Sequence, residues 1–295
     1  MVSRSITLPA IALVAALVAC ATPQTLVKTA PGAPTQVIVP RNNYTPAQDV
    51  QLGQQAAEQV RKQLPILRDE LLTSYVTSIG QRLVAVIPPD LQHPEFRYSF
   101  EVVNVKEINA FALPGGPMFV NRGMLAAAAN EGEIAGVMAH ELSHVILRHG
   151  TAQASKATPY QVGAIAGQVV GAIVGGQLGG LIAQGTQFGI STAFMRFSRE
   201  FEKQADIEGA HLMARAGYDA QDMAMMFKTL EAQGGASAPD WLSDHPNPGD
   251  RFTYITQEAQ ALHVANPVRD TREFQAAQAH LKELPPAPAA PRSSE

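Results

Sequence analysis

The chain has 295 residues, a formal net charge of −4 at pH 7, 46% hydrophobic residues and 16% charged residues. This apolar fraction supplies one sizeable core and excludes a globally disordered chain, while the mild acidic balance, without a run of Lys or Arg, gives no basic surface for nucleic acid. Because Cys20 is the single cysteine, an intrachain disulfide and a thiolate-rich zinc cluster are excluded, and any metal chemistry must use nitrogen and oxygen ligands.

The first residues predict export. One early positive charge, Arg4, precedes a mostly apolar run over residues 6–19, which is typical of a secretory signal and too short to span a membrane as a helix. The sequence Leu17-Val18-Ala19-Cys20 resembles the bacterial lipobox, in which cleavage precedes a cysteine that is then acylated. The resemblance implies a lipoprotein signal peptide over residues 1–19, a lipid anchor on Cys20 and, from the non-acidic Ala21, the inner face of the outer membrane. An ordinary signal peptide with an incidental cysteine is the alternative.

Proline-rich segments flank the central part of the chain. Residues 21–46 contain five prolines and no periodic apolar pattern, so we expect a lipidated N-terminus and a tether over residues 20–46. Residues 284–295 are rich in Pro and Ala and predict a disordered tail. One globular domain is therefore expected over residues 47–283.

The apolar periodicity in this domain changes from helical to strand-like and back. Helical spacing over residues 47–87, divided by Pro65, predicts two helices. A period of two over residues 96–102 predicts a strand, and two further short strands are expected over residues 110–113 and 118–120. Helical patterns follow to the end, so we expect an α+β fold that is mainly α, with a small β-sheet.

A capped helix is predicted from residue 131 onward. Asn130 and Glu133 have the spacing of a capping box, and Arg148-His149-Gly150 is typical of a helix end, with basic residues in the last turn and glycine beyond. This places His149 as a helix C-terminal group.

The motif His140-Glu141-Leu142-Ser143-His144 lies inside this helix. Four residues make about one turn, so both histidines project from one face and can reach one metal ion. Glu141 lies beside both imidazoles and is placed to polarise a metal-bound water. Two histidines that merely pack or cap inside an ordinary helix are the alternative.

A catalytic zinc takes three protein ligands and keeps one position open. No Asp or Glu occurs between Glu141 and Glu200, and the next helical pattern carries Glu202 and Asp206 one turn apart. Glu200 points roughly 200° away from Glu202, at about 100° per residue. We therefore expect Glu202 to be the third ligand of one Zn²⁺, and Asp206 to hold a ligand imidazole in its binding tautomer. A solvated acidic face is the alternative.

These motifs and Asn109-Ala110-Phe111-Ala112-Leu113-Pro114-Gly115-Gly116 closely resemble family forty-eight of the metallopeptidases over roughly residues 47–260. These gluzincins include HtpX, the CAAX prenyl proteases and the bacterial periplasmic or lipoprotein members LoiP and BepA. The resemblance implies a gluzincin-type domain with its small sheet packed on the zinc-binding helix, and a zinc metalloendopeptidase in envelope protein quality control. It implies misfolded or unassembled envelope proteins as substrates and an envelope assembly machine as a partner.

The same resemblance assigns roles to two further segments. It makes the hairpin containing Asn109, Ala110, Phe111, Ala112, Leu113, Gly115 and Gly116 the edge that pairs with an extended substrate, where the sequence alone predicts a surface hairpin. It also places His245, which is followed by Arg251, on a loop over the metal. We expect His245 or Arg251 to assist the transition state. His245 as a fourth ligand would instead favour the alternative function, a chaperone or assembly factor for outer-membrane proteins with latent protease activity.

A glycine-spaced segment over residues 157–195 carries no charge, and Gly163, Gly167, Gly171, Gly175 and Gly179 recur every four residues. Such spacing predicts helices that pack closely, either beneath the zinc helix or against a partner. A membrane-inserted hairpin is the alternative.

Overall fold

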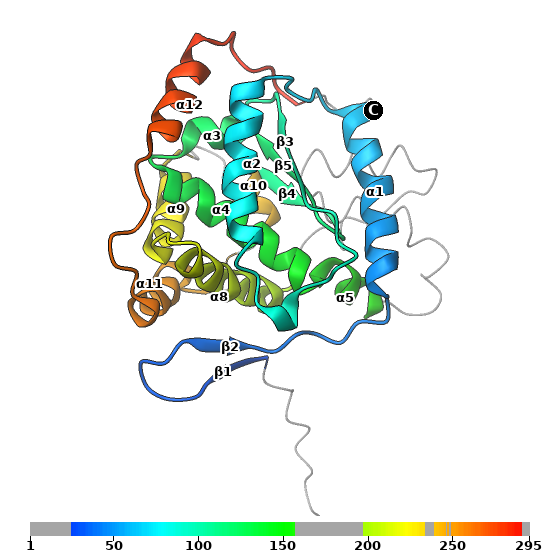
Figure 1. The fold of residues 1–295 in the computed structure, drawn as a ribbon, viewed down its shortest axis with the longest axis vertical. Helices are drawn as coiled ribbons and strands as arrows, with labels where there is room; N and C mark the ends of the chain where they lie inside the picture. Colours follow the sequence, from blue (N-terminus) through cyan, green and yellow to red (C-terminus); the bar gives the residue numbers. More distant parts are fainter. Residues whose placement is uncertain (1–24, 157–196, 234–238, 246, 248, 291–295) are drawn as a thin grey trace, which may run out of the picture.

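The computed structural model describes residues 25–156, 197–233, 239–245, 247 and 249–290. Cys20, the predicted signal peptide and the glycine-spaced segment 157–195 lie outside the described residues. A three-stranded sheet and a group of helices form the body, and a two-stranded hairpin lies along its lower edge in Figure 1. The elements are β1 (Leu26–Lys28), β2 (Thr35–Val37), α1 (Pro46–Gln63), α2 (Glu70–Val84), the 3₁₀ turn η1 (Pro89–Leu91), β3 (Ser99–Val103), β4 (Ala110–Ala112), β5 (Pro117–Asn121), α3 (Arg122–Ala127), α4 (Glu131–Ile146), α5 (His149–Ser155), α8 (Arg199–Arg215), α9 (Ala220–Gln233), α10 (Asp240–Asp244), α11 (Arg251–Leu262) and α12 (Arg272–Glu283).

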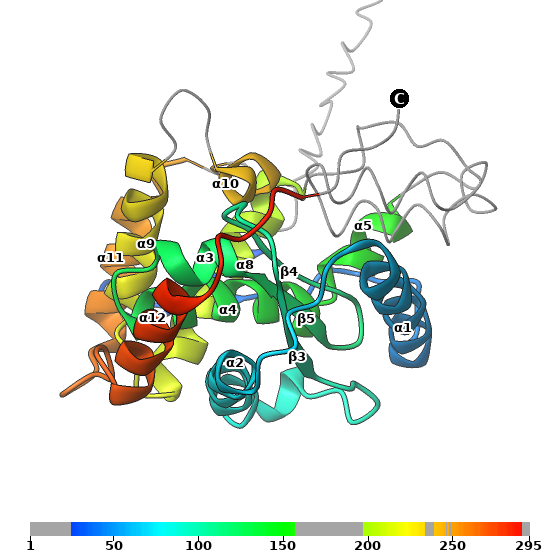
Figure 2. The ribbon, with the colours of Figure 1, turned by 90° about the horizontal axis from the view of Figure 1, so that it is seen from above.

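The three-stranded sheet has the order β3-β5-β4, with β3 parallel and β4 antiparallel to β5. Because side chains alternate along a strand, Met118 and Val120 of β5 join the main core with α2 and α4, whereas Phe119 points to the opposite face. There Phe119 stacks on Phe111 of β4 in a second core that includes α1. Figure 2 shows α1 and α2 on opposite sides of the sheet. The three predicted strands are confirmed, although the first begins at Ser99.

Helix α4 occupies the centre of the fold, and every residue from Glu131 to Ile146 is buried. It packs against α2, α8, α9 and β4. The Asn130 side chain accepts a hydrogen bond from the Glu133 amide at 2.9 Å, which confirms the predicted N-cap. Glu133 reaches back one residue further than a capping box requires, because its carboxylate accepts from the Ala129 amide at 2.8 Å.

The predicted end of α4 at Arg148-His149, with Gly150 just beyond, is wrong. The helix ends at Ile146, and Arg148 takes the left-handed conformation, with φ 57°. Its guanidinium contacts the Asp49 carboxylate at 2.5 Å and donates to the Tyr44 carbonyl, and these contacts offset the strain of a positive φ at a non-glycine residue. The chain therefore turns one residue before His149, which opens α5 instead of closing α4.

Both predicted flanking segments are partly folded. Strands β1 and β2 pair antiparallel, and β2 packs on α8, so the chain from Thr25 onward is no free tether. At the other end the Arg122 guanidinium donates to the Pro285 carbonyl at 2.7 Å, and Ala290 is 5% exposed. The prediction of a disordered tail is thus wrong for residues 284–290, because backbone carbonyls and a small apolar side chain suffice to dock a proline-rich segment. No helix within the described ranges is long and apolar enough to cross a membrane.

Candidate metal centre

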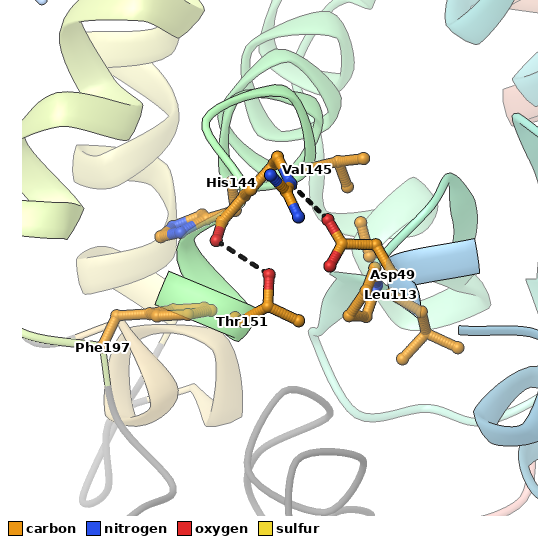
Figure 3. Close-up of a pocket in the computed structure, with 10 residues that line it drawn as sticks. Asp49, Leu113, His144, Val145, Thr151 and Phe197 are labelled. Carbon is orange, nitrogen blue, oxygen red and sulfur yellow. Dashed lines mark hydrogen bonds and ion pairs between the residues drawn. The ribbon is translucent and has the colours of Figure 1, made fainter. Parts of the chain in front are cut away.

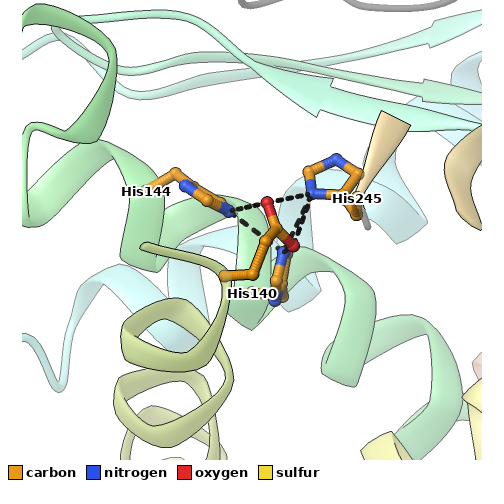
Figure 4. A group of neighbouring side chains, drawn as sticks. His140, His144 and His245 are labelled. Atoms are coloured by element: carbon orange, nitrogen blue, oxygen red, sulfur yellow. Dashed lines mark hydrogen bonds and ion pairs between the residues drawn. The ribbon is translucent and has the colours of Figure 1, made fainter. Parts of the chain in front are cut away.

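Three elements bring four potential ligands together. His140 and His144 come from α4, Glu202 from α8, and His245 follows α10 directly. One ligand atom from each side chain lies within 4.8 Å of the others, and all four residues are buried. Figure 4 shows the three labelled imidazoles turned toward one point. His140 Nε2 lies 3.0 Å from His144 Nε2 and 3.1 Å from His245 Nδ1.

These donors fit one zinc ion. Glu202 Oε2 lies 3.5 Å from His140 Nε2, and Glu202 Oε1 lies 3.6 Å from His144 Nε2. Tetrahedral zinc with bonds of about 2.0–2.1 Å places its ligand atoms about 3.3 Å apart, which is close to the observed separations. The set contains nitrogen and oxygen donors only, as the sequence requires. The predicted trio of His140, His144 and Glu202 is therefore brought together, and His245 is the fourth member of the group.

Asp206 and Arg251 form hydrogen bonds with two of the potential ligands, His140 and Glu202. Asp206 Oδ1 lies 2.9 Å from His140 Nδ1, so His140 Nε2 is the ring nitrogen that faces the other potential ligands. Arg251 donates from Nε to Asp206 at 2.7 Å and from Nη2 to Glu202 at 2.8 Å, and Tyr254 also donates to Asp206. Arg251 is 3% exposed, so it orients two carboxylates instead of facing substrate. Arg251 was predicted to assist the transition state, whereas in the structure its guanidinium binds Asp206 and Glu202.

Burial and charge act in opposite directions on the ligands. Burial disfavours the charged form of Glu202, but the charge of His245 and the hydrogen bonds of His140 and His245 hold its pKa well below the usual range. Burial likewise disfavours protonation of His140, yet Asp206 and Glu202 raise its pKa to about 9. Burial lowers the pKa of His144 well below its usual range. The carboxylates of Glu202 and Asp206 thus supply the negative charge that offsets the burial of the neighbouring imidazoles.

Glu141 is held beside the metal ligands by two donors. The Ala112 amide of β4 donates to its Oε2 at 3.2 Å, and Trp241 Nε1 of α10 donates to its Oε1 at 3.0 Å. His245 Nε2 lies 3.3 Å from the same Oε1, while its Nδ1 faces the ligand group. His245 also stacks on Trp241, with ring centroids 4.7 Å apart. The His245 ring therefore lies between the metal position and the carboxylate predicted to act as base.

The edge of the sheet borders this centre. β4 is an edge strand, and its Ala112 amide points away from β5 toward Glu141. A cleft beside His144 runs between Phe197 and Leu113 (Figure 3). Its lining consists of Asp49, Ala112, Leu113, Pro114, His144, Val145, Arg148, Gly150, Thr151 and Phe197.

The predicted substrate hairpin divides into two parts. Ala110, Phe111, Ala112 and Leu113 form or follow β4, and Asn109 joins it to α10 by donating to Asp244 at 3.0 Å. Gly115 and Gly116 are turn residues with φ of 76° and 124°. A Cβ on Gly115 would lie 2.6 Å from the Val50 Cα, so this glycine permits close packing on α1. Gly115 was predicted to contact substrate, whereas in the structure it packs against α1.

Sequence reasoning missed the roles of three buried residues near the potential ligands: Trp241 and Gln204 were not predicted as site residues, and His149 was predicted as a helix C-terminal group. Trp241 holds Glu141, as described above. His149 Nδ1 lies 2.9 Å from His144 Nδ1, and His149 Nε2 lies 3.0 Å from the side-chain oxygen of Gln204. Burial, with little compensation from Gln204, lowers the pKa of His149 to about 3. The sequence contained one hint of Gln204, because it lies midway between the predicted site residues Glu202 and Asp206.

Comparisons with known proteins agree with this geometry. The sequence profile described as Peptidase family M48 matches residues 70–259. The putative beta-barrel assembly-enhancing protease of Vibrio cholerae is 30% identical over 218 residues, which cover 72% of this chain and 44% of that protein. The beta-barrel assembly-enhancing protease of Escherichia coli K12 is 30% identical over 221 residues, covering 73% and 44%. Human mitochondrial metalloendopeptidase OMA1 is 29% identical over 168 residues, covering 55% and 32%.

The chain therefore spans less than half the length of these relatives, with 44% the largest share among the three. The profile match nevertheless includes all four potential ligands and Glu141. By this match, the chain belongs to peptidase family M48, a family of zinc-dependent metallopeptidases.

Proposed function

We propose that this protein is a zinc metalloendopeptidase. His140, His144 and Glu202 hold one zinc ion, and the observation that carries the proposal is the convergence of their ligand atoms within 4.8 Å beside Glu141. Zinc, when bound, supplies a Lewis acid that activates water and polarises a peptide carbonyl. Glu141 takes a proton from the attacking water and passes it to the leaving amine. Its hydrogen bonds with Ala112 and Trp241 aim the carboxylate for both transfers.

The substrate is an extended peptide that lies along β4. Among the described residues this strand pairs with another strand on one side only. On its other side, where the Ala110 and Ala112 amides now donate to Asn109 and Glu141, an added peptide would gain backbone hydrogen bonds that depend little on side chains. Leu113, which follows β4, and Phe197 also line a small cleft beside His144. Such recognition suits a protease that acts on unfolded chains of varied sequence.

The test compares the wild type with Glu141→Gln. The amide keeps the shape of the carboxylate but cannot take a proton, so cleavage of unfolded casein should fall by about 10²–10⁴-fold. Zinc content, measured on the same samples, should stay at one ion per chain. Undiminished cleavage by Glu141→Gln would refute the role of Glu141, and absence of zinc from the wild type would refute the proposal as a whole.

We further infer that the protein works in a bacterial cell envelope on misfolded or unassembled envelope proteins, held there by a lipid on Cys20. The lipobox-like sequence and the names of the Vibrio and Escherichia relatives, which describe beta-barrel assembly-enhancing proteases, support this inference. Wild type should fractionate with membranes, and Cys20→Ala should be released by carbonate. Retention of Cys20→Ala in the membrane pellet would contradict anchoring by lipid alone.

A second candidate function is an assembly factor whose protease activity is latent. His245 favours it, because its Nδ1 lies 3.2 Å from both carboxylate oxygens of Glu202 and so takes the position that water needs. If His245 closes the site, His245→Ala should cleave casein faster than the wild type. Slower cleavage by His245→Ala would instead favour assistance by His245 in the transition state.

A further inference from the structure

A hydrogen-bonded chain runs from the N-terminal hairpin to a metal ligand. The Gln204 side chain is fully buried on α8. Its Nε2 donates to the Ile38 carbonyl at 3.0 Å and to the Thr25 carbonyl at 3.4 Å. These carbonyls flank the open end of the hairpin, where the Ile38 amide donates to Thr25 at 2.9 Å. Gln204 therefore binds both strands at the point where they leave the β1–β2 ladder.

The hairpin carbonyls determine which group donates and which accepts in each hydrogen bond of the series from Gln204 through His149 to His144. Backbone carbonyls only accept, so the Gln204 amide must turn its NH₂ toward the hairpin and its oxygen toward His149. His149 Nε2, 3.0 Å away, must then carry a proton. A neutral imidazole has a single N–H, so His149 Nδ1 accepts, and the His144 Nδ1 that lies 2.9 Å from it donates. This leaves the lone pair of His144 Nε2 for the metal.

The two ligand histidines are therefore oriented by different means. His140 is held by the carboxylate of Asp206, which is itself fixed by Arg251 within the same helical body. His144 is held by His149, which is fully buried and stacks on Phe201 with ring centroids 4.4 Å apart. Among the described residues, the hydrogen bonds of Asp206 stay within helices α4, α8 and α11, whereas those of His149 and Gln204 reach the N-terminal hairpin.

We propose that His149 and Gln204 are positioning residues that couple docking of the hairpin, residues 25–38, to the zinc affinity of His144. The inference rests on the zinc centre proposed above. With the hairpin docked, the amide of Gln204 is fixed and His144 presents Nε2 to the metal. With the hairpin undocked, the amide can rotate, and the tautomer and ring orientation of His144 are no longer imposed. Because coupling between two equilibria is reciprocal, zinc must also stabilise the docked hairpin.

Two variants of the full chain break the coupling at different places. His149→Phe keeps the stacking on Phe201 and the contacts between Gln204 and the hairpin, but it removes the acceptor for His144. Its zinc affinity, measured by competition with a chromophoric chelator, should fall about 10–100-fold. Gln204→Met keeps the shape but removes the hydrogen bonds to His149 and to the hairpin, and its zinc affinity should fall about tenfold. His280→Phe is the control, since it breaks the contact with Asp69 at 2.6 Å on another face, and it should stay within twofold of wild type.

Hydrogen exchange of the peptide over residues 25–38 separates coupling from a merely structural role. Zinc should slow this exchange in the wild type and should have no effect on it in His149→Phe, although the latter retains every contact of the hairpin with Gln204. Zinc affinity within twofold of wild type in both variants, or zinc protection that persists in His149→Phe, would overturn the coupling. If His149→Phe fails to fold, Gln204→Met decides by the same two measurements. A wild-type chain without zinc would overturn the metal centre and the coupling together, whereas zinc-binding variants with unchanged affinity would overturn the coupling alone.

Discussion

Two of the buried pairs of histidine and carboxylate among the described residues look alike in isolation. His140 Nδ1 lies 2.9 Å from Asp206, and His211 Nε2 lies 2.9 Å from Glu258. In both pairs burial disfavours the imidazolium, but neighbouring carboxylates raise the pKa of the histidine to about 9. Distance, burial and pKa therefore do not distinguish a metal ligand from a structural ion pair.

The second ring nitrogen makes the difference. His140 Nε2 faces His144, His245 and Glu202, so three further ligand atoms surround one point. Among the described residues His211 belongs to no such group, and its Nδ1 lies 3.7 Å from Glu208.

Glu258 is occupied elsewhere. It accepts from the amide and the hydroxyl of Thr35 at 2.7 Å each, and so anchors the hairpin. Convergence of ligand atoms, and not a carboxylate–imidazole pair, identifies the metal centre.

Removal of a ligand gives the largest expected effect. Glu202→Ala should lose zinc affinity by more than about 100-fold, beyond the range typical of residues that only support ligands. Glu200→Ala is the matched control, because Glu200 is exposed on the same first turn of α8. Chelator competition on both variants tests the assignment, and equal affinities would contradict it.

Exchange of each supporting carboxylate for its amide separates the two pairs. Asp206→Asn should weaken zinc binding by about 10–100-fold, because it no longer holds His140 in its binding tautomer. Glu258→Gln weakens the anchor of the hairpin but leaves the contact of Asp206 with His140 intact, so it should lower zinc affinity less than Asp206→Asn does and should also lower the free energy of unfolding. A zinc affinity that falls equally in both variants would show that the two pairs do not differ in their effect on the metal centre.

The contact between α4 and α8 lies between the two pairs. A Cβ on Gly209 would come within 3.1 Å of the His140 amide nitrogen. Gly209→Ala should therefore push the helices apart and lower the free energy of unfolding by about 1–3 kcal/mol. Urea denaturation measures this loss, and unchanged stability would show that the helices are free to adjust at this point.

The hairpin anchor should depend on pH. The pKa of His211 in the folded chain, about 9, lies above its ordinary value of 6.5. Its ion pair with Glu258 and Glu208 therefore stabilises the fold fully below about pH 6.5 and loses this effect as the pH rises through about 9. The difference in unfolding free energy between wild type and His211→Gln should be largest near pH 6 and should close by about pH 10. A difference independent of pH would show that His211 is not protonated in the fold.

The local part of the metal centre could be predicted from the sequence. His140 and His144 lie on one face because of helix geometry alone, and Asn130 caps that helix by a bond within one turn. Glu202 could be predicted as the third ligand because no Asp or Glu occurs between Glu141 and Glu200 and because Glu200 points away from the face that Glu202 shares with Asp206. The period of two over residues 96–102 likewise predicted the strand that precedes β4 and β5.

The remaining features depend on contacts between distant segments. Nothing near His149 in sequence indicates that Gln204 and the hairpin complete its hydrogen bonds. The turn at Arg148 escaped prediction because contacts from Asp49 and Tyr44, about a hundred residues earlier, offset its strain. The proline-rich ends were expected to be free because composition alone does not show which carbonyls a buried Arg122 can reach.

X-ray absorption at the zinc edge of the purified wild-type chain tests the central claim most directly. We predict one zinc per chain, bound by nitrogen and oxygen atoms only at about 2.0–2.2 Å, with scattering from imidazole rings and a changed first coordination sphere in Glu202→Ala. A protein that retains no zinc, or whose zinc environment is the same after Glu202→Ala, would contradict the metal centre described here.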